Sequence, residues 1–104
     1  MPEQSVLELC RMLKERYAPE GVEILGIFGS YARGEQTPES DVDIAYRLDE
    51  NRFFTRYKGF AAAARIGEIA GEVEEALHKK VDFVSVNSMN KRLSKNIYKD
   101  LAYA

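Results

Sequence analysis

The sequence predicts a small α/β (α+β) domain in which helices flank a mixed sheet of three or more strands, in the order helix, strand, turn, strand, helix, strand, helix. Apolar residues recur with helical spacing in three segments, and three short runs rich in β-branched residues have the character of strands. We find no repeat, biased segment or linker, so residues 1–104 are expected to form a single domain.

Three helices are expected from the periodicity of apolar side chains. The first covers residues 6–17, and the proline and glycine of residues 19–21 end it. A long amphipathic helix is expected over residues 53–77, weakened by three internal glycines. A last helix begins near residues 87–88 and extends to Leu101.

Three strands are expected between these helices. Residues 22–28 form a buried strand, residues 41–48 a half-buried strand with alternating polar and apolar positions, and residues 81–86 a third strand. The polar segment 34–40 is a loop. The first two strands can pair antiparallel across this connection, whereas the helix before the third strand allows a parallel crossover.

Composition excludes several classes of function. Residues 1–50 carry 5 basic and 11 acidic side chains, and residues 79–104 carry 6 and 2, so no single basic character dominates and direct nucleic-acid binding is not expected. No apolar run is long enough for a membrane span and no signal peptide is apparent, which predicts a cytoplasmic protein. Cys10 is the only cysteine, so neither an internal disulfide nor a Cys/His zinc cluster is possible.

Carboxylates on two predicted strands point to a metal site. Asp41 and Asp43 lie two residues apart and share one face of their strand, and Asp82 lies near the start of the third strand. Paired carboxylates repel each other unless a cation lies between them, and oxygen ligands favour Mg²⁺ or Mn²⁺ together with a phosphate-bearing substrate. A third carboxylate allows a two-metal arrangement.

A Gly-Ser pair at the end of the first strand offers the complementary phosphate site. Gly29 lets a ligand approach the backbone closely, Ser30 supplies a hydroxyl and N–H groups, and Arg33 one turn later can add a positive charge. The chain lacks the P-loop and dinucleotide-binding motifs. Each feature alone is more typical of a turn or a solvated strand edge, but the combination on three independent elements favours a site.

These residues carry a resemblance to a known family. The run Gly-Ser-Tyr-Ala-Arg-Gly-Glu at residues 29–35, followed by Ser-Asp-Val-Asp-Ile at residues 40–44, resembles the minimal nucleotidyltransferases of the DNA polymerase β-like superfamily. Their signature is Gly-Ser, ten residues, then Asp-x-Asp, and residues 31–40 are those ten. The Ala-Arg-Gly-Glu extension is similar to the MntA-type antitoxin branch, which pairs with a HEPN-domain toxin.

The resemblance implies a nucleotidyltransferase fold and a role for each motif residue. Asp41 and Asp43 would bind a catalytic Mg²⁺ pair, with Asp82 as the third carboxylate that assists the nucleophile. Gly29 and Ser30 would hold the phosphates of ATP, and Arg33 matches the motif of the family at the nucleotide site. The implied reaction is transfer of AMP from ATP to a tyrosine hydroxyl of the HEPN toxin, which silences its RNase activity.

Two other functions remain open at this stage. The protein could neutralise a partner by contact alone, or it could transfer a nucleotide to a small-molecule hydroxyl. A chain of 104 residues provides a nucleotide site but no second domain to enclose a small acceptor, which favours a protein acceptor.

Two surface features lack a role in this scheme. Four aromatic residues within residues 53–60 exceed what one helix face can bury, so some are expected in an exposed patch that docks a partner. Basic residues in the last helix predict a solvated face, or a contact with an acidic partner or the triphosphate; they are Lys91, Arg92, Lys95 and Lys99.

Overall fold

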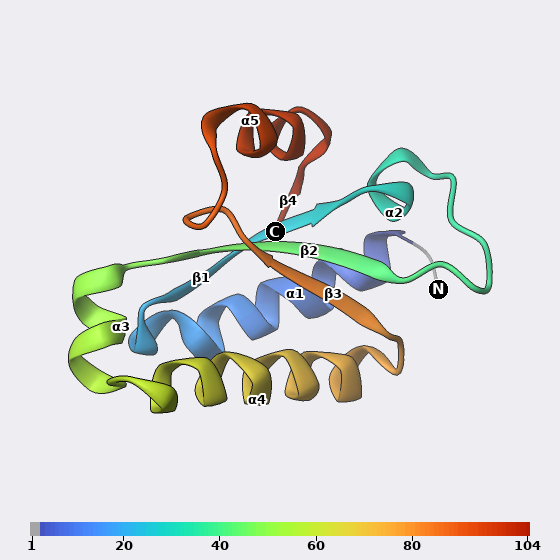
Figure 1. The fold of residues 1–104 in the computed structure, drawn as a ribbon. Helices are drawn as coiled ribbons and strands as arrows, with labels where there is room; N and C mark the ends of the chain where they lie inside the picture. The colour runs from blue at the N-terminus through green and yellow to red at the C-terminus, as the bar shows by residue number, and fades with distance from the viewer. Residues whose placement is uncertain (1–2) are drawn as a thin grey trace.

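The computed structural model describes residues 3–104 and confirms the mixed α/β class (Figure 1). Its elements are α1 (Glu3–Tyr17), a 3-10 turn η1 (Ala18–Glu20), β1 (Val22–Phe28), α2 (Ser30–Arg33), β2 (Val42–Leu48), α3 (Glu50–Arg56), α4 (Phe60–Leu77), β3 (Val81–Ser85), α5 (Lys91–Asp100) and β4 (Ala102–Tyr103). Within residues 3–104, no helix is both long enough and apolar enough to cross a bilayer.

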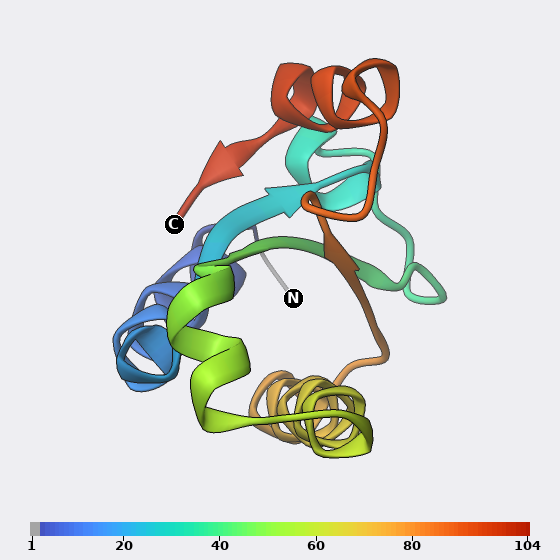
Figure 2. The same ribbon diagram turned by 60° about the vertical axis from the view of Figure 1, so that its left-hand side comes forward.

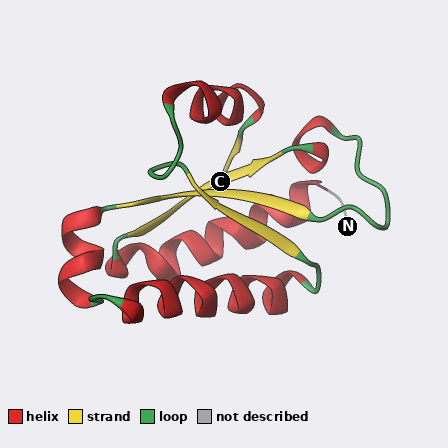
Figure 3. Cartoon of the chain, in the orientation of Figure 1, coloured by secondary structure: helices red, strands yellow, loops and turns green. Residues whose placement is uncertain are grey.

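The sheet has four strands in the order β3-β2-β1-β4, coloured yellow in Figure 3. β1 pairs antiparallel with β2, and β2 pairs parallel with β3, so both predicted pairings are confirmed. The two-residue strand β4 was not expected; it pairs antiparallel with β1 and returns the end of the described chain to the sheet.

A β-bulge in β1 changes which of its side chains face the same way. Ile24 is opposite Tyr46 in β2 and Gly26 is opposite Ala45, so one extra residue of β1 lies between these pairs. Ile24 and Ile27 therefore both enter the main core although they are three positions apart. Simple alternation along residues 22–28 does not predict this placement.

Two unequal layers cover the sheet, as Figure 2 shows. α1 and α4 lie against one face, which we call the helix-packed face, while α5 lies against the opposite face. The main core fills the helix-packed face and includes Cys10, which is fully buried. Burial raises the pKa of the Cys10 thiol to about 11.

The expected continuous helix over residues 53–77 is wrong in one respect. The helical segment divides into α3 and α4, because Tyr57 is extended and Gly59 has φ 60° and ψ −130°, a conformation that only glycine adopts readily. Asp49 caps α3 by accepting a hydrogen bond from the Arg52 N–H at 3.3 Å. The break turns Phe53 into the core and leaves Phe60 95% exposed.

The last helix also begins later than expected, at Lys91, with Asn90 as its cap. Asn87 does not start this helix. Its side chain accepts a hydrogen bond from Leu48 N at 2.7 Å and donates one to Leu48 O at 3.2 Å. This contact joins the segment after β3 to the end of β2. The basic residues of the helix are exposed, as predicted for Lys91, Arg92, Lys95 and Lys99.

A polar network joins three helical elements beside the main core. Arg65 of α4 donates to both carboxylate oxygens of Glu20 at 2.7 Å and to Glu72 at 3.3 Å. Tyr57 donates to Glu20 and Tyr17 donates to Glu72, each at 2.6 Å. The hydrogen bonds from Arg65 lower the pKa of Glu20 to about 2, and the hydrogen bond from Tyr57 adds to this effect.

Candidate active site

The predicted site residues meet where β1 ends and β2 and β3 begin. Asp43 lies opposite Phe28, the last residue of β1, and is also in register with Asp82 of β3. The order of the strands therefore places Asp43 between the Gly-Ser turn and the third carboxylate. Sequence spacing alone did not establish that Asp43 and Asp82 are cross-strand neighbours.

Both carboxylates belong to the face of the sheet opposite α1 and α4. Val42 and Ile44 on either side of Asp43 are fully buried in the main core, and Val81 before Asp82 joins the same core. Because strand side chains alternate, Asp43 and Asp82 lie on the other face, which we call the carboxylate face. The face that carries α5 is thus the face that carries these acidic groups.

The backbone of Gly29 lies against the carboxylate of Asp43. Gly29 has φ 73° and ψ −149°, a region that is essentially restricted to glycine. A Cβ atom at this position would collide with Oδ2 of Asp43. Gly29 is therefore required both for the turn from β1 into α2 and for the space that the Asp43 carboxylate occupies.

The environment of Asp43 disfavours its charged form. Partial burial is the largest effect that raises the pKa of Asp43, followed by the negative charges of Asp82 and Asp41. The positive charge of Arg33 acts in the opposite direction. Three of the other five predicted site residues therefore act electrostatically on Asp43.

Asp41 lies immediately before β2 and is exposed. Its position is set by the chain before β3, because Lys79 Nζ donates to Pro38 O at 2.8 Å and to Ser40 O at 3.2 Å. Val42 N donates to Lys80 O at 3.0 Å. The segment between α4 and β3 thus holds the 34–40 loop and the start of β2 in place.

Ser30 and Arg33 begin and end the single turn of α2. Arg33 donates to Asp100 Oδ2 of α5 at 3.0 Å and lies 3.4 Å from Glu35 Oε1. Asp100 was not among the predicted residues. A signal was nevertheless present, since Asp82 and Asp100 are the only two acidic residues after position 78.

The donor set suits a hard divalent cation that also contacts substrate. Residues 3–104 contain no ready-made cluster of three or more His, Cys, Asp or Glu side chains around a common point. Mg²⁺ commonly takes only one or two protein carboxylates and completes its octahedron with water and phosphate oxygens. The adjacent Asp43 and Asp82, whose charges repel each other, fit that pattern.

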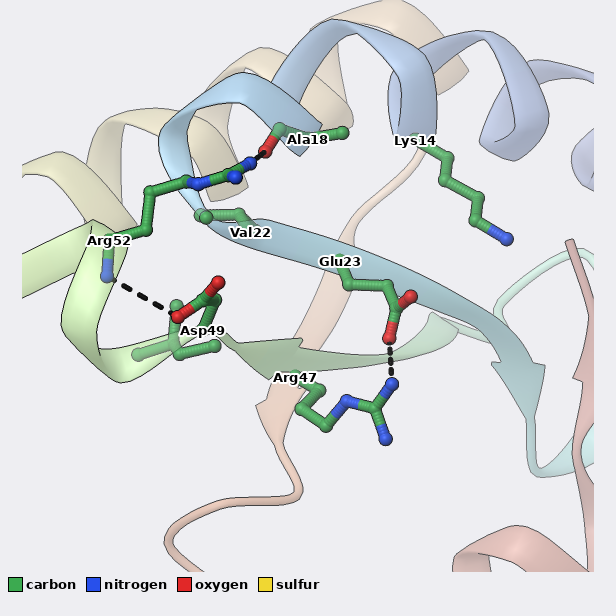
Figure 4. A pocket seen from close by; sticks show the side chains of 9 residues that line it. Lys14, Ala18, Val22, Glu23, Arg47, Asp49 and Arg52 are labelled. Carbon is green, nitrogen blue, oxygen red and sulfur yellow. Dashed lines mark hydrogen bonds and ion pairs between the residues drawn. The ribbon is translucent and has the colours of Figure 1, made fainter.

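A hollow lies at the other end of β1 and β2, away from the predicted site residues (Figure 4). It has a volume of about 340 Å³ and is bordered by Lys14, Glu23, Arg47 and Arg52 among others. Its charged groups are already engaged, since Arg47 pairs with Glu23 and Arg52 donates to Ala18 O at 3.5 Å. None of the six predicted site residues lines it.

Comparison with known proteins assigns the class. Residues 11–102 match the family model described as polymerase beta, nucleotidyltransferase, and the chain belongs to this family. It is a nucleotidyltransferase with the fold of the minimal members of the group. The predicted family and enzyme class are confirmed.

Two relatives of similar length are named as protein adenylyltransferases. A Methanocaldococcus jannaschii protein, provisionally named a protein adenylyltransferase, is 38% identical over 96 residues, or 89% of this chain and 84% of that protein. "Protein adenylyltransferase MntA" of Thermococcus cleftensis is 31% identical over 91 residues, or 88% of this chain and 80% of that protein.

Two solved structures are similar. One, described provisionally as a minimal nucleotidyltransferase, has a TM-score of 0.76 at 24% identity and covers 100% of this chain and 97% of its own, which supports the fold. The other is described as a toxin-antitoxin crystal structure with AMP-PNP. It has a TM-score of 0.56 at 26% identity and covers 89% of this chain and 64% of its own.

Proposed function

We propose that this nucleotidyltransferase is an antitoxin that transfers AMP from ATP to a tyrosine hydroxyl of a HEPN-domain toxin. The observation that carries the proposal is the placement of Asp43, with Gly29 against its carboxylate and Asp82 in register on the next strand. This arrangement joins a phosphate-binding turn to paired metal-binding carboxylates within one site.

Similarity to other proteins supports the acceptor and partner in this proposal. The Thermococcus cleftensis relative is named as a protein adenylyltransferase, and the toxin-antitoxin structure was solved with AMP-PNP, an ATP analogue. Both are similar to this chain over most of its length. A protein hydroxyl is therefore preferred to a small-molecule hydroxyl as the acceptor.

The reaction that we propose is a single substitution at the α-phosphorus of ATP. The tyrosine oxygen forms a bond to that phosphorus, and the bond from the α-phosphorus to the bridging oxygen breaks to release pyrophosphate. Asp82 accepts the hydroxyl proton, while Gly29 and Ser30 hold the phosphates through backbone N–H groups and the Ser30 hydroxyl. Arg33 adds positive charge on the same side.

Two Mg²⁺ ions, or Mn²⁺ in their place, belong to this proposal. Asp41, Asp43 and Asp82 would hold them. When bound, such ions neutralise phosphate charge and make the attacking hydroxyl more acidic. The repulsion that raises the pKa of Asp43 would then be offset, so the metal-bound form is expected to keep Asp43 ionised.

The test combines the purified protein with Mg-ATP and a candidate HEPN-domain toxin. Intact-mass and peptide mass spectrometry of the HEPN protein are expected to show the addition of AMP to a tyrosine. Asp43→Asn is expected to lower the rate at least about 100-fold, as is common when a group that stabilises transition-state charge is lost. Glu8→Gln on the exposed side of α1 is the matched control and retains full activity.

The same variants separate the alternatives. An Asp43→Asn protein that still neutralises the toxin without any mass change would contradict the enzymatic mechanism and favour inhibition by contact. Nucleotide addition to a small hydroxyl compound, with an unmodified toxin, would contradict the protein acceptor. Full transfer activity in Asp43→Asn would remove the site assignment itself.

A further inference from the structure

One ion pair joins the Gly-Ser turn to the last helix of the chain. Arg33 is the last residue of α2, and Asp100 is the last residue of α5. Nη1 of Arg33 donates to Oδ2 of Asp100 at 3.0 Å, although the two residues are 67 positions apart in the sequence. Figure 2 shows α5 directly above α2. Asp100 thus reaches the turn from a segment that contains none of the six predicted site residues.

The Arg33 guanidinium lies within electrostatic reach of Asp43, because its positive charge lowers the pKa of that carboxyl. Two carboxylates hold it. Nη1 binds Asp100, and Nε lies 3.4 Å from Oε1 of Glu35. Nη2 makes no hydrogen bond or ion pair with any of residues 3–104. A planar guanidinium that is fixed at one edge keeps its remaining N–H groups in a defined direction, and such groups bind phosphate.

The backbone at Asp100 is fixed by packing that does not involve Arg33. Ile97, one turn earlier in α5, is buried in an apolar cluster on the carboxylate face, and Leu101 packs against this cluster. β4 follows at once and pairs with β1. A Cβ atom at Gly26 of β1 would collide with the backbone oxygen of Ala102, so the close approach of β4 requires this glycine. The sheet therefore sets the position of Asp100.

The ion pair is too exposed to contribute much to folding. The side chains of Arg33 and Asp100 are 45% and 40% exposed, and exposed ion pairs usually add little to stability. An arginine side chain without a partner samples many rotamers, and a ligand that binds it must order it. A carboxylate in a fixed place restricts the guanidinium before the ligand arrives, which lowers the entropic cost of binding.

The charge of Asp100 separates this role from a direct effect on the nucleotide. A carboxylate close to bound phosphates repels them, so its removal would strengthen nucleotide binding if Asp100 acted by its charge alone. If Asp100 acts by holding Arg33, its removal weakens nucleotide binding. The two possibilities therefore predict changes of opposite sign in the dissociation constant.

We propose that Asp100 is a positioning residue, which holds the Arg33 guanidinium where it contacts the phosphates of the bound nucleotide. The inference rests on the proposed function, because it takes the Gly-Ser turn to be the phosphate site. Asp100 itself makes no contact with the nucleotide. Through this residue, α5 and β4 contribute to nucleotide binding although both lie far from the Gly-Ser turn in the sequence.

Isothermal titration calorimetry with Mg²⁺ and α,β-methylene-ATP tests the proposal without a toxin, since the bridge between the α- and β-phosphates of this analogue is not broken. Asp100→Ala is expected to raise the dissociation constant about 3- to 10-fold, the effect of losing order in one long side chain. Glu15→Gln, exposed on α1, is the control and leaves the constant unchanged. A dissociation constant that Asp100→Ala leaves unchanged or lowers overturns the proposal.

A double-mutant cycle tests whether Asp100 acts through Arg33. Arg33→Ala alone is expected to raise the dissociation constant at least about 10-fold, because charge-assisted hydrogen bonds to phosphate are lost. In the Arg33→Ala background, Asp100→Ala is expected to leave the constant unchanged or to lower it, since only the repulsion by the carboxylate remains. An equal loss of affinity from Asp100→Ala in both backgrounds overturns the positioning role. An Arg33→Ala protein with wild-type affinity overturns it as well.

Failure of this inference and failure of the proposed function give different results. A wild-type protein that does not bind the analogue removes the phosphate site and overturns both. Binding that Arg33→Ala weakens and Asp100→Ala does not weaken overturns only the role of Asp100. A complete double-mutant cycle as expected, together with an unmodified toxin in the transfer assay, supports the role of Asp100 and contradicts the proposed acceptor.

Discussion

The two faces of the sheet differ in how much they bury and in what they expose. The helix-packed face holds the main core, with the largest fully buried side chains of the protein among its residues. The carboxylate face has a smaller cluster of four buried residues, Leu25, Ala45, Val86 and Ile97. Asp43 and Asp82 lie beside that smaller cluster. The comparison indicates that one face supplies most of the folding free energy and leaves the other open to charged ligands.

A matched pair of isoleucines tests this difference most directly. Ile69 on the helix-packed face is fully buried, whereas Ile97 on α5 is 8% exposed in the smaller cluster. Ile69→Ala is expected near the top, and Ile97→Ala near the bottom, of the range of about 2–5 kcal/mol for isoleucine-to-alanine changes in protein cores. Urea unfolding measures both, and equal losses would contradict the unequal layers.

The Arg65 network is the next largest contribution on the helix-packed side. Arg65→Gln is expected to cost about 1.5–3 kcal/mol, since two hydrogen bonds to the Glu20 carboxylate are lost and Glu20 keeps only the one from Tyr57. Arg11→Gln on the exposed side of α1 is the control and changes the free energy of unfolding little.

The same variant has a defined pH dependence. The pKa of Glu20 is lowered from 4.5 to about 2, so the stabilisation that it provides is complete above pH 4.5 and is lost as the pH falls toward 2. Arg65→Gln is expected to flatten this part of the stability curve. An unchanged dependence between these pH values would show that Arg65 does not set the pKa of Glu20.

Gly29→Ala perturbs the carboxylate face from its edge. The positive φ of Gly29 and the collision with Asp43 Oδ2 together predict a loss of about 1–3 kcal/mol and a displaced carboxylate. Gly34→Ala is a useful comparison, because Gly34 also has a positive φ, 70°, but has no neighbour within 4 Å of a Cβ atom. Thermal unfolding and Mg²⁺ titration of both variants separate backbone strain from loss of the site.

Asp43→Asn has the smallest expected effect on stability, and it is expected to stabilise the protein, whereas the other substitutions destabilise it. The pKa of Asp43 is raised above its ordinary value of 3.8, so ionisation opposes folding and this cost appears as the pH rises above that value. Without metal, Asp43→Asn is expected to raise the Tm at neutral pH by about 2–4 °C, and the gain disappears in acid. A lower Tm at neutral pH would contradict the cost of burying the Asp43 charge beside Asp82 and Asp41.

Most of the fold followed from local pattern. The helical spacing of apolar residues, the runs of β-branched residues and the helix-ending segment at residues 19–21 predicted strand positions that agree closely with the structure. These signals are local because they reflect the burial of one side of each element. The errors occurred where a contact distant in sequence decided the conformation. The break before Phe60 brings Tyr57 to Glu20, and Asn87 binds the end of β2 in place of starting a helix.

The sequence by itself determined the class of the protein and the kinds of residue in its site, because the Gly-Ser and Asp-x-Asp spacing is local. Only the tertiary structure decided that Asp82 lies beside Asp43, that Gly29 packs against the Asp43 carboxylate, and that Arg33 pairs with Asp100. The reason is physical: strand order, register and the bulge in β1 arise from packing between segments distant in the chain, which no local periodicity contains.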